Sequence, residues 1–299
     1  MGEGGGGPVA RSAGAGRARL AVPPGAADCH FHVYDSARAP AAAPWGAPGP
    51  GFDATAEDYR ALAVRLGTTR GVLVQPSAYG TDNAPHLDAL DALGGPGRFR
   101  LVAVVAADAT DAELDALHAR GCRGVRVNLA RPGPLSAADL PALCARLAAR
   151  EGWHVQVHPA DEAAFVALGG ALLAAPGTLV LDHMAHVARP GGAGFDLLRR
   201  LLDTGRGWVK LSAPYRASRE GPPRYADAGA AAAALARHAP GRVVWGSDWP
   251  HPNLPPGAAA PDDAAILDLL ADWVPGEEAR RRVLVDNPAA LYGFGPAVP

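Results

Sequence analysis

The feature that most constrains the fold is a pattern that recurs eight times: a short apolar run, a polar or Gly/Pro-rich loop, then a helical segment. The apolar runs are DCHFHVYD (28–35), GVLVQPS (71–77), FRLVAVVAA (99–107), GVRVNL (124–129), HVQVH (154–158), LVLDHMA (179–185), WVKLSAP (208–214) and RVVWGSDWP (242–250). Near-continuous apolar strands that alternate with helices indicate a parallel sheet covered on both faces. Eight such units predict an α/β fold, a closed (β/α)8 TIM-type barrel, over an open doubly wound sheet.

The barrel is expected to be a single domain over residues 21–299. Alanine- and leucine-rich segments predict helices, among them 56–67, 111–121, 137–150, 225–239 and, closing the chain, 277–294. Residues 1–20 are rich in Gly, Ala and Arg and predict a disordered tail. No GxGxxG motif follows the first strand, which disfavours a dinucleotide-binding fold.

Charge and hydropathy exclude several kinds of partner. A net charge of -2 gives no reason to expect a nucleic acid or an anionic membrane surface. No run approaches the roughly 18 apolar residues of a membrane span, and the first residues lack the apolar core of a signal peptide. The 3 cysteines lack CxxC spacing, so neither disulfides nor a thiolate zinc site is expected. We therefore expect a cytoplasmic protein; its oligomeric state stays open.

The first apolar run carries two histidines one residue apart. Alternate side chains of a strand share a face, so His30 and His32 are expected to lie beside Asp28 and Tyr34. The opposite face would then hold Cys29, Phe31 and Val33. Two imidazoles on one face suit a metal ion or an anionic intermediate.

Further polar residues end other strands of the predicted barrel. His158 ends the fifth run, His183 the sixth and Asp248 the eighth. Chemistry in such barrels takes place at the carboxyl ends of the strands. Together with His30 and His32 these residues are therefore expected to meet at one mouth, where imidazole and carboxylate would suit Zn²⁺, Mn²⁺ or Fe²⁺.

This arrangement resembles the amidohydrolase superfamily of TIM-barrel, metal-dependent hydrolases. The segments DCHFHVYD, LVQPSAYGTDN, RGVRVNL, VKLSAPYR and VVWGSDWPHP resemble its branch of sugar-lactone and 2-pyrone-4,6-dicarboxylate lactonases, which also contains a galactarolactone isomerase. The resemblance runs from about Asp28 to Phe294. It implies a hydrolase that opens a sugar-acid or related carboxylated lactone.

The resemblance implies one divalent metal at most. Binuclear members bridge their metals with a carbamylated lysine or a glutamate, usually on the fourth strand, and GVRVNL has neither; the only lysine, Lys210, lies in the seventh strand. One Zn²⁺ or Mn²⁺ would be held by His30, His32, His158 and Asp248. The open alternative is catalysis without metal, as in the pyrone lactonases of this branch, with the histidines alone polarising the substrate carbonyl.

In either case the resemblance implies that Asp248 takes the proton of the attacking water and passes it to the leaving oxygen. His183 would stabilise the oxyanion of the tetrahedral intermediate, and His30 and His32 would polarise the carbonyl. A lactone isomerase would replace water with a substrate hydroxyl. An aromatic-acid decarboxylase and a barrel that binds a ligand without turnover are further alternatives.

The substrate is expected to be a small anionic lactone, because arginine forks match carboxylates and several arginines lie near the predicted mouth. Candidate substrate-binding residues lie on the fourth strand, where alternation puts two of them on one face, and at the ends of the second and seventh strands. They are Ser77, Tyr79, Thr81, Arg126, Asn128, Tyr215 and Arg216, with Arg131 ranked lower. For Ser77, Tyr79 and Thr81 the alternative is that residues 80–83 form an ordinary turn that binds no ligand.

The remaining histidines are expected to have lesser roles. His154, deeper in the barrel, would make internal hydrogen bonds. His186 and His251 would orient the site residues that they follow by three positions. His86, His118 and His238 fall in predicted helices and are expected to be solvated.

Overall fold

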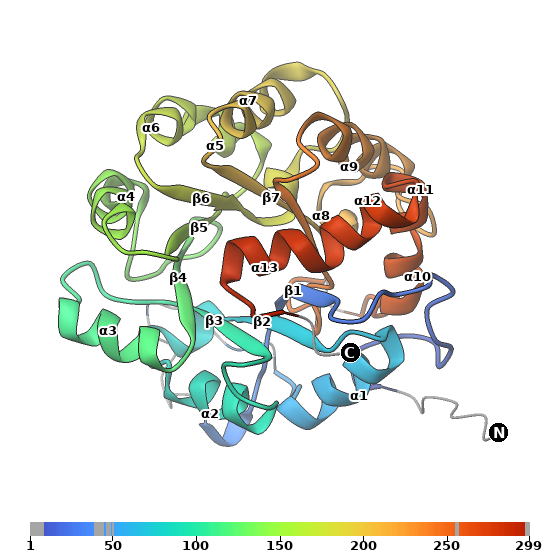
Figure 1. Ribbon diagram of the computed structural model, residues 1–299, viewed down its shortest axis with the longest axis horizontal. Helices are drawn as coiled ribbons and strands as arrows, with labels where there is room; N and C mark the ends of the chain where they lie inside the picture. The colour runs from blue at the N-terminus through green and yellow to red at the C-terminus, as the bar shows by residue number, and fades with distance from the viewer. Residues whose placement is uncertain (1–8, 39–44, 46–48, 50, 255–256, 297–299) are drawn as a thin grey trace.

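The computed structural model describes residues 9–38, 45, 49, 51–254 and 257–296. Within them, eight parallel strands follow one another around a barrel in chain order, which confirms the predicted fold class (Figure 1). The strands are β1 Ala27–Phe31, β2 Arg70–Val74, β3 Phe99–Ala103, β4 Cys122–Asn128, β5 His154–His158, β6 Thr178–Leu181, β7 Gly207–Ser212 and β8 Val243–Gly246.

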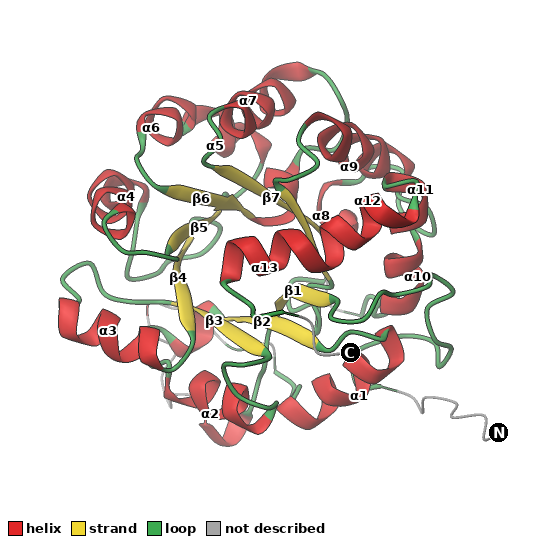
Figure 2. Ribbon diagram, viewed as in Figure 1, coloured by secondary structure: helices red, strands yellow, loops and turns green. Residues whose placement is uncertain are grey.

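Helices surround the strands on the outside (Figure 2). They are α1 Ala56–Leu66, α2 Ala84–Ala92, α3 Asp111–Ala119, α4 Leu140–Ala148, α5 Glu162–Ala167, α6 Gly169–Ala174, α7 Gly192–Asp203, α8 Pro214–Ala217, α9 Ala226–His238, α10 Asp263–Asp268, α11 Leu270–Trp273, α12 Glu277–Arg281 and α13 Asn287–Tyr292. Leu291 and Tyr292 of α13 pack with Ala27 and Val72 at the amino ends of the first strands, so α13 covers one end of the barrel. No helix in the described ranges is both long and apolar enough to span a bilayer.

Local sequence signals explain where two of the outer helices begin. Thr55 before α1 and Thr110 before α3 each accept a hydrogen bond from the backbone of the third helical residue. The acidic residues at those positions, Asp58 and Glu113, bond back to the threonine backbone. These reciprocal capping boxes satisfy amide groups that a helix start leaves unpaired.

The barrel closes between β8 and β1 through residues of the predicted site. The amide of Asp248 donates to the carbonyl of His30 (2.8 Å), and the amide of His32 donates to the carbonyl of Trp249 (2.8 Å). The backbone that completes the barrel therefore also sets the separation between the histidine pair and Asp248.

An irregularity in β1 changes the predicted faces of that strand. Asp28 pairs with Gly71 of β2, whereas Phe31 pairs with Leu73, so three steps along β1 match two along β2. One extra residue of this kind is a bulge, and it shifts the alternation of side chains by one.

Asp28 consequently faces outward, where its carboxylate accepts hydrogen bonds from the amide (2.9 Å) and hydroxyl (2.6 Å) of Ser247. Cys29 packs in the buried interior cluster that contains residues of β2, β6 and β8. The expected shared face is therefore correct for His30 and His32 and wrong for Asp28 and Cys29.

The N-terminal segment from residue 9 to residue 20 lies against the barrel. The indole of Trp249 donates to the carbonyl of Ala10 (2.8 Å), the amide of Ala13 donates to the carbonyl of Pro261 (2.9 Å), and Arg19 pairs with Asp268 (2.8 Å). This differs from the predicted disordered tail over 9–20, because specific groups on the barrel match the segment's backbone. Residues 1–8 lie outside the described ranges.

Two histidines outside the predicted site are more buried than expected. His86 is 1% exposed, and its Nε2 donates to the carbonyl of Val33 (3.1 Å), so the prediction that it is solvated is wrong. His154 lies inside the barrel against the ring of Tyr292 (5.4 Å), and neither of its ring nitrogens makes a hydrogen bond within the described residues. His118 and His238 are only partly buried.

Burial lowers the pKa of both His86 and His154 to about 3. Below the usual histidine pKa of about 6.5 the unfolded chain binds protons that the folded chain does not. The free energy of unfolding should therefore fall as the pH drops from about 6.5 towards 3. The free energy of unfolding is measured by urea titration at pH 7, 6 and 5. Its slope against pH should be smaller in His86→Gln than in the wild type, by up to about 1.4 kcal/mol per pH unit. Identical slopes for the variant and the wild type would contradict this.

Candidate active site

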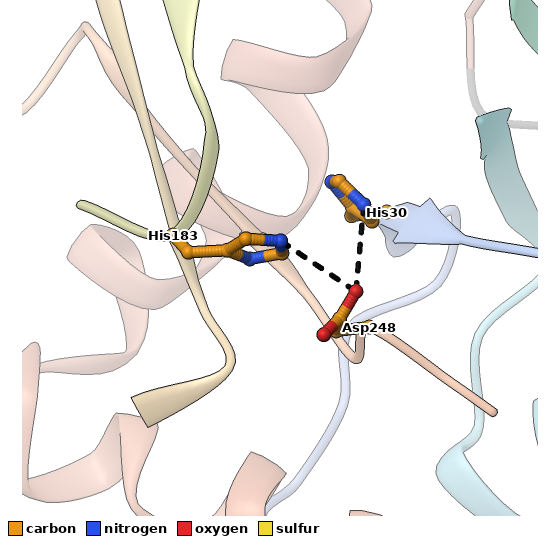
Figure 3. Close-up of side chains that lie close together, drawn as sticks. All are labelled: His30, His183 and Asp248. Atoms are coloured by element: carbon orange, nitrogen blue, oxygen red, sulfur yellow. Dashed lines mark ion pairs between the residues drawn. The ribbon is translucent and has the colours of Figure 1, made fainter. Parts of the chain in front are cut away.

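Three imidazoles surround one oxygen of Asp248. The Nε2 atoms of His30, His32 and His183 lie 3.5, 3.5 and 3.6 Å from Asp248 Oδ1, and all four side chains are buried. Figure 3 shows His30 and His183 approaching Asp248 from two sides. The structure thus brings together the four residues predicted to be catalytic.

Left-handed backbone aims these side chains. Residues 183–186 follow β6 with φ between 50° and 62°, and Asp248 follows β8 with φ 62°. Left-handed conformations cost roughly 1–2 kcal/mol per non-glycine residue, and they persist where the surrounding structure holds them, commonly at functional sites. The turn after β6 also ends strand alternation, so Asp182 and His183 both point into the site.

A buried ionic layer lies beneath the imidazoles. Asp182 Oδ1 lies 3.2 Å from His30 Nδ1 and 3.6 Å from Lys210 Nζ, and its Oδ2 lies 3.5 Å from Arg126 Nε. Lys210 also donates to Gln156 (2.7 Å). Neither Asp182 nor a role for Lys210 in the site was predicted from the sequence. The available signal for Asp182 was an aspartate directly before a site histidine in LVLDHMA.

Burial sets the protonation of this layer. It lowers the pKa of His30 to about 3 and that of Lys210 to about 8, in each case against the attraction of Asp182. Burial would raise the pKa of Asp182, but His30 and Lys210 hold it well below its usual value. At neutral pH the layer therefore combines an ionised carboxylate, a cationic lysine and a neutral imidazole.

His158 lies between two guanidinium groups. Arg126 Nη2 is 3.0 Å from its Nδ1, and Arg216 Nη2 is 3.2 Å from its Nε2. A neutral imidazole has one acceptor nitrogen, so it can accept from only one of the two arginines. The predicted metal ligand His158 lies beside His183, at 5.1 Å between ring centroids, but its nitrogens face the arginines. Its role as a ligand stays a prediction.

The second oxygen of Asp248 is bound by Tyr215. The Tyr215 hydroxyl lies 2.6 Å from Asp248 Oδ2 and 2.9 Å from His251 Nδ1, and His251 Nε2 lies 3.2 Å from Asp263. Burial, together with the charge of Asp248, raises the pKa of Tyr215 well above its usual value. The phenol therefore stays protonated and donates to Asp248, which places His251 behind Tyr215 as a supporting residue.

A cavity of about 710 Å³ opens at this end of the barrel. Its lining includes His32, Arg126 and His251, and among the described residues that line it none has a carboxylate side chain. Ser77 and Asn128 also line it and bond to each other (2.8 Å), and Arg131 bonds to Asn253 (2.7 Å). Arg11, which was not predicted from the sequence to be a site residue, also lines the cavity.

Four predicted substrate-binding residues are not among those that line the cavity. Tyr215 and Arg216 contact Asp248 and His158, and Tyr79 and Thr81 lie elsewhere. The Tyr79 hydroxyl donates to the carbonyl of Asp35 (3.0 Å) and accepts from its amide (2.8 Å), so it holds the loop after β1. Thr81 is exposed and borders a separate pocket beside α2 and α3. The structure does not bring Tyr79 or Thr81 to the cavity, because the loop after β2 turns away beyond Ala78.

The chemistry of the donor set fits a divalent metal. His32 Nδ1 faces the carbonyl of Val74 (2.7 Å), which can only accept, so Nδ1 carries the proton of a neutral ring. His32 Nε2 then presents a lone pair to Asp248 Oδ1 (3.5 Å) and to His30 Nε2 (3.3 Å). Such an arrangement attracts a cation, and atoms each about 2.1 Å from one ion lie roughly 3.0–3.4 Å apart. His30, His183 and Asp248 form one group whose ligand atoms lie within 4.8 Å of one another.

A (β/α)8 barrel with paired histidines on its first strand, and further histidine and aspartate after later strands, defines an amidohydrolase-type enzyme. The sequence profile of the amidohydrolase family matches residues 27–294, and the chain belongs to that family.

The relatives of this chain include enzymes that act on lactones. It is 35% identical to the 4-sulfomuconolactone hydrolase of Rhizobium radiobacter, covering 96% of this chain and 95% of that protein. It is 33% identical to the D-galactarolactone isomerase of Agrobacterium fabrum (92% and 94%), and 34% identical to the 2-pyrone-4,6-dicarboxylate hydrolase of Comamonas testosteroni (91% and 91%). These relatives belong to the branch that the sequence resembles.

The same architecture occurs in solved structures. An apo crystal structure from Agrobacterium tumefaciens superposes with a TM-score of 0.84 at 32% identity, covering 96% of this chain and 99% of the other.

Proposed function

We propose that this enzyme hydrolyses a carboxylated lactone, with Asp248 as the general base. The main support for an anionic substrate is that the Nε atoms of Arg11 and Arg216 are buried and have no hydrogen-bond partner within the described residues, while the Nε of Arg126 has only an ion-pair contact with Asp182 at 3.5 Å. Buried polar groups are rarely left unpaired, and guanidinium groups match carboxylates. The named lactone enzymes among the relatives support the choice of a lactone.

The residues divide the reaction between them. Arg126 and Arg216 bind the anionic group of the substrate and turn the lactone carbonyl towards the imidazoles. Asp248 accepts a proton from water as the water oxygen bonds to the carbonyl carbon. His183 stabilises the oxyanion that forms. When the ring C–O bond breaks, the leaving oxygen takes the proton from Asp248, and the product is a hydroxy acid.

Tyr215 and the ionic layer hold these groups in position. Tyr215 bonds to the Asp248 oxygen that does not face the imidazoles, which fixes the carboxylate plane. Asp182 and Lys210, in the layer beneath the imidazoles, both contact Nδ1 of His30. Removing a neighbour that orients a site residue in this way typically lowers activity by about 10–100-fold.

We propose further that one Zn²⁺ or Mn²⁺ is held by His30, His32 and Asp248, with His183 in place of the His158 predicted from the sequence, because both nitrogens of His158 face arginines. When bound, the ion would act as a Lewis acid on the carbonyl and lower the pKa of water. Metal-free catalysis by the same residues is the alternative.

Elemental analysis decides between these two. Protein purified without chelator should contain about one metal per chain, His32→Ala should lose it, and His158→Ala should keep it because His158 contacts arginines. Loss of metal in His158→Ala would return His158 to the ligand set in place of His183. A metal-free wild type that opens lactones in the presence of chelator would contradict the metal proposal.

An isomerase is the second candidate, since the Agrobacterium fabrum relative is one. Turnover in water labelled with oxygen-18 tests the proposed function directly. A hydrolase places one labelled oxygen in the product carboxylate, whereas an isomerase, which uses a substrate hydroxyl, places none. An unlabelled product lactone would therefore overturn hydrolysis in favour of isomerisation.

A further inference from the structure

The N-terminal segment delivers an arginine to the cavity. Arg11 lines it, with the guanidinium carbon 4.0 Å from the ring centroid of Phe52. Its Nε is buried and unpaired within the described residues. We propose that Arg11 is a substrate-recognition residue that binds a second anionic group of the lactone, apart from the group at Arg126. This inference rests on the proposed function and narrows its substrate class to lactones with two anionic groups.

The backbone on both sides of Arg11 is anchored to the barrel. The carbonyl of Ala10 accepts from the indole of Trp249 (2.8 Å), and the hydroxyl of Ser12 accepts from Arg65 (3.1 Å). Arg11 itself has φ 59°, a left-handed conformation that disfavours side chains. The segment thus holds Arg11 in a conformation that has an intrinsic cost, which is typical of residues positioned for function.

The charge of Arg11 has no counterpart in the cavity. Stacking on Phe52 is a cation–π contact and leaves the N–H groups at the edge of the guanidinium available. Arg126 and Arg131 line the same cavity, and no carboxylate side chain does so among the described residues. Guanidinium groups that line one cavity favour an anion there. The cavity is therefore complementary to a ligand with more than one negative charge.

Trp249 links this recognition to the reaction. It follows Asp248 directly, and its carbonyl accepts from the amide of His32 in the bond that closes the barrel. Trp249 therefore holds the backbone next to Arg11 and is also adjacent to the general base Asp248. An anionic group bound by Arg11 would consequently have a fixed position relative to the scissile carbonyl.

The test compares Arg11→Met with Arg17→Met, a matched variant at an exposed position of the same segment. Removing a charge-assisted hydrogen bond of this kind lowers the affinity for the bound group by about tenfold or more. Arg11→Met should raise KM for a dicarboxylated lactone by about that factor, and should leave kcat/KM for a monocarboxylated lactone within about twofold. Arg11→Lys keeps the positive charge but loses the forked guanidinium, so its KM for the dicarboxylated lactone should lie between those of the wild type and Arg11→Met. Arg17→Met should match the wild type.

A binding measurement separates this inference from the proposed function. Citrate, a tricarboxylate that cannot be hydrolysed as a lactone, is titrated calorimetrically into the wild type and the variants. Weaker citrate binding in Arg11→Met, with wild-type affinity in Arg17→Met, supports Arg11 even if no lactone is turned over. Unchanged citrate affinity in Arg11→Met, equal losses on both lactones, or no citrate binding by the wild type would each overturn the assignment.

Discussion

Asp248→Asn is expected to lower kcat by about 10³-fold, with kcat/KM falling by a similar factor. The amide cannot take the proton of the attacking water, and it also removes the negative charge that faces three imidazoles. Substrate affinity should change little, because the carboxylated part of the lactone is bound by the arginines. Initial rates of ring opening, followed by base uptake at constant pH, measure the effect.

The fold should survive this change. The hydrogen bond that Asp248 contributes to barrel closure comes from its backbone amide, which asparagine keeps. Asp203→Asn, on the surface where Asp203 pairs with His238 (2.6 Å), is the matched control and should keep wild-type rates. A kcat for Asp248→Asn within threefold of the wild type, with an unchanged melting temperature, would remove Asp248 from the role of base.

Most of the barrel could be predicted from the sequence, because burial on both faces leaves a near-continuous apolar signal in most strands. The departures are local. The β1 bulge adds one residue between Asp28 and Phe31, and no residue type in DCHFHVYD marks such an insertion. A strict period of two therefore gave Asp28 and Cys29 the wrong faces while the histidine pair stayed correct.

The site residues that were not predicted depend on contacts distant in sequence. Asp182 points inward only because the left-handed turn after β6 breaks the alternation. Arg11 reaches the cavity because Trp249, more than 200 positions away, holds the backbone beside it. In composition, the segment that carries Arg11 resembles a solvated tail, and only the matching groups on the barrel show otherwise.

Asp182→Asn is expected to lower the free energy of unfolding by about 3–5 kcal/mol, because it leaves buried Lys210 and Arg126 without their carboxylate. Lys210→Met should cost a similar amount, since Asp182 would lose its ammonium partner and keep His30, the amide of Gln156 at 3.1 Å and a guanidinium at 3.5 Å. If the two residues act as a pair, Asp182→Asn with Lys210→Met should cost less than the sum of the single changes by about 2 kcal/mol. Urea unfolding at pH 7.5 gives all three values.

The exposed pair Arg224 and Asp272, 3.1 Å apart, supplies the control. Because water screens exposed charges, Asp272→Asn should change the free energy of unfolding by less than about 0.5 kcal/mol. Strictly additive losses at Asp182 and Lys210 would mean that each side chain is stabilised by other neighbours. Asp182 and Lys210 both contact Nδ1 of His30. If their losses of stability are coupled and the variant protein that remains folded also has a lower kcat, the layer also orients His30.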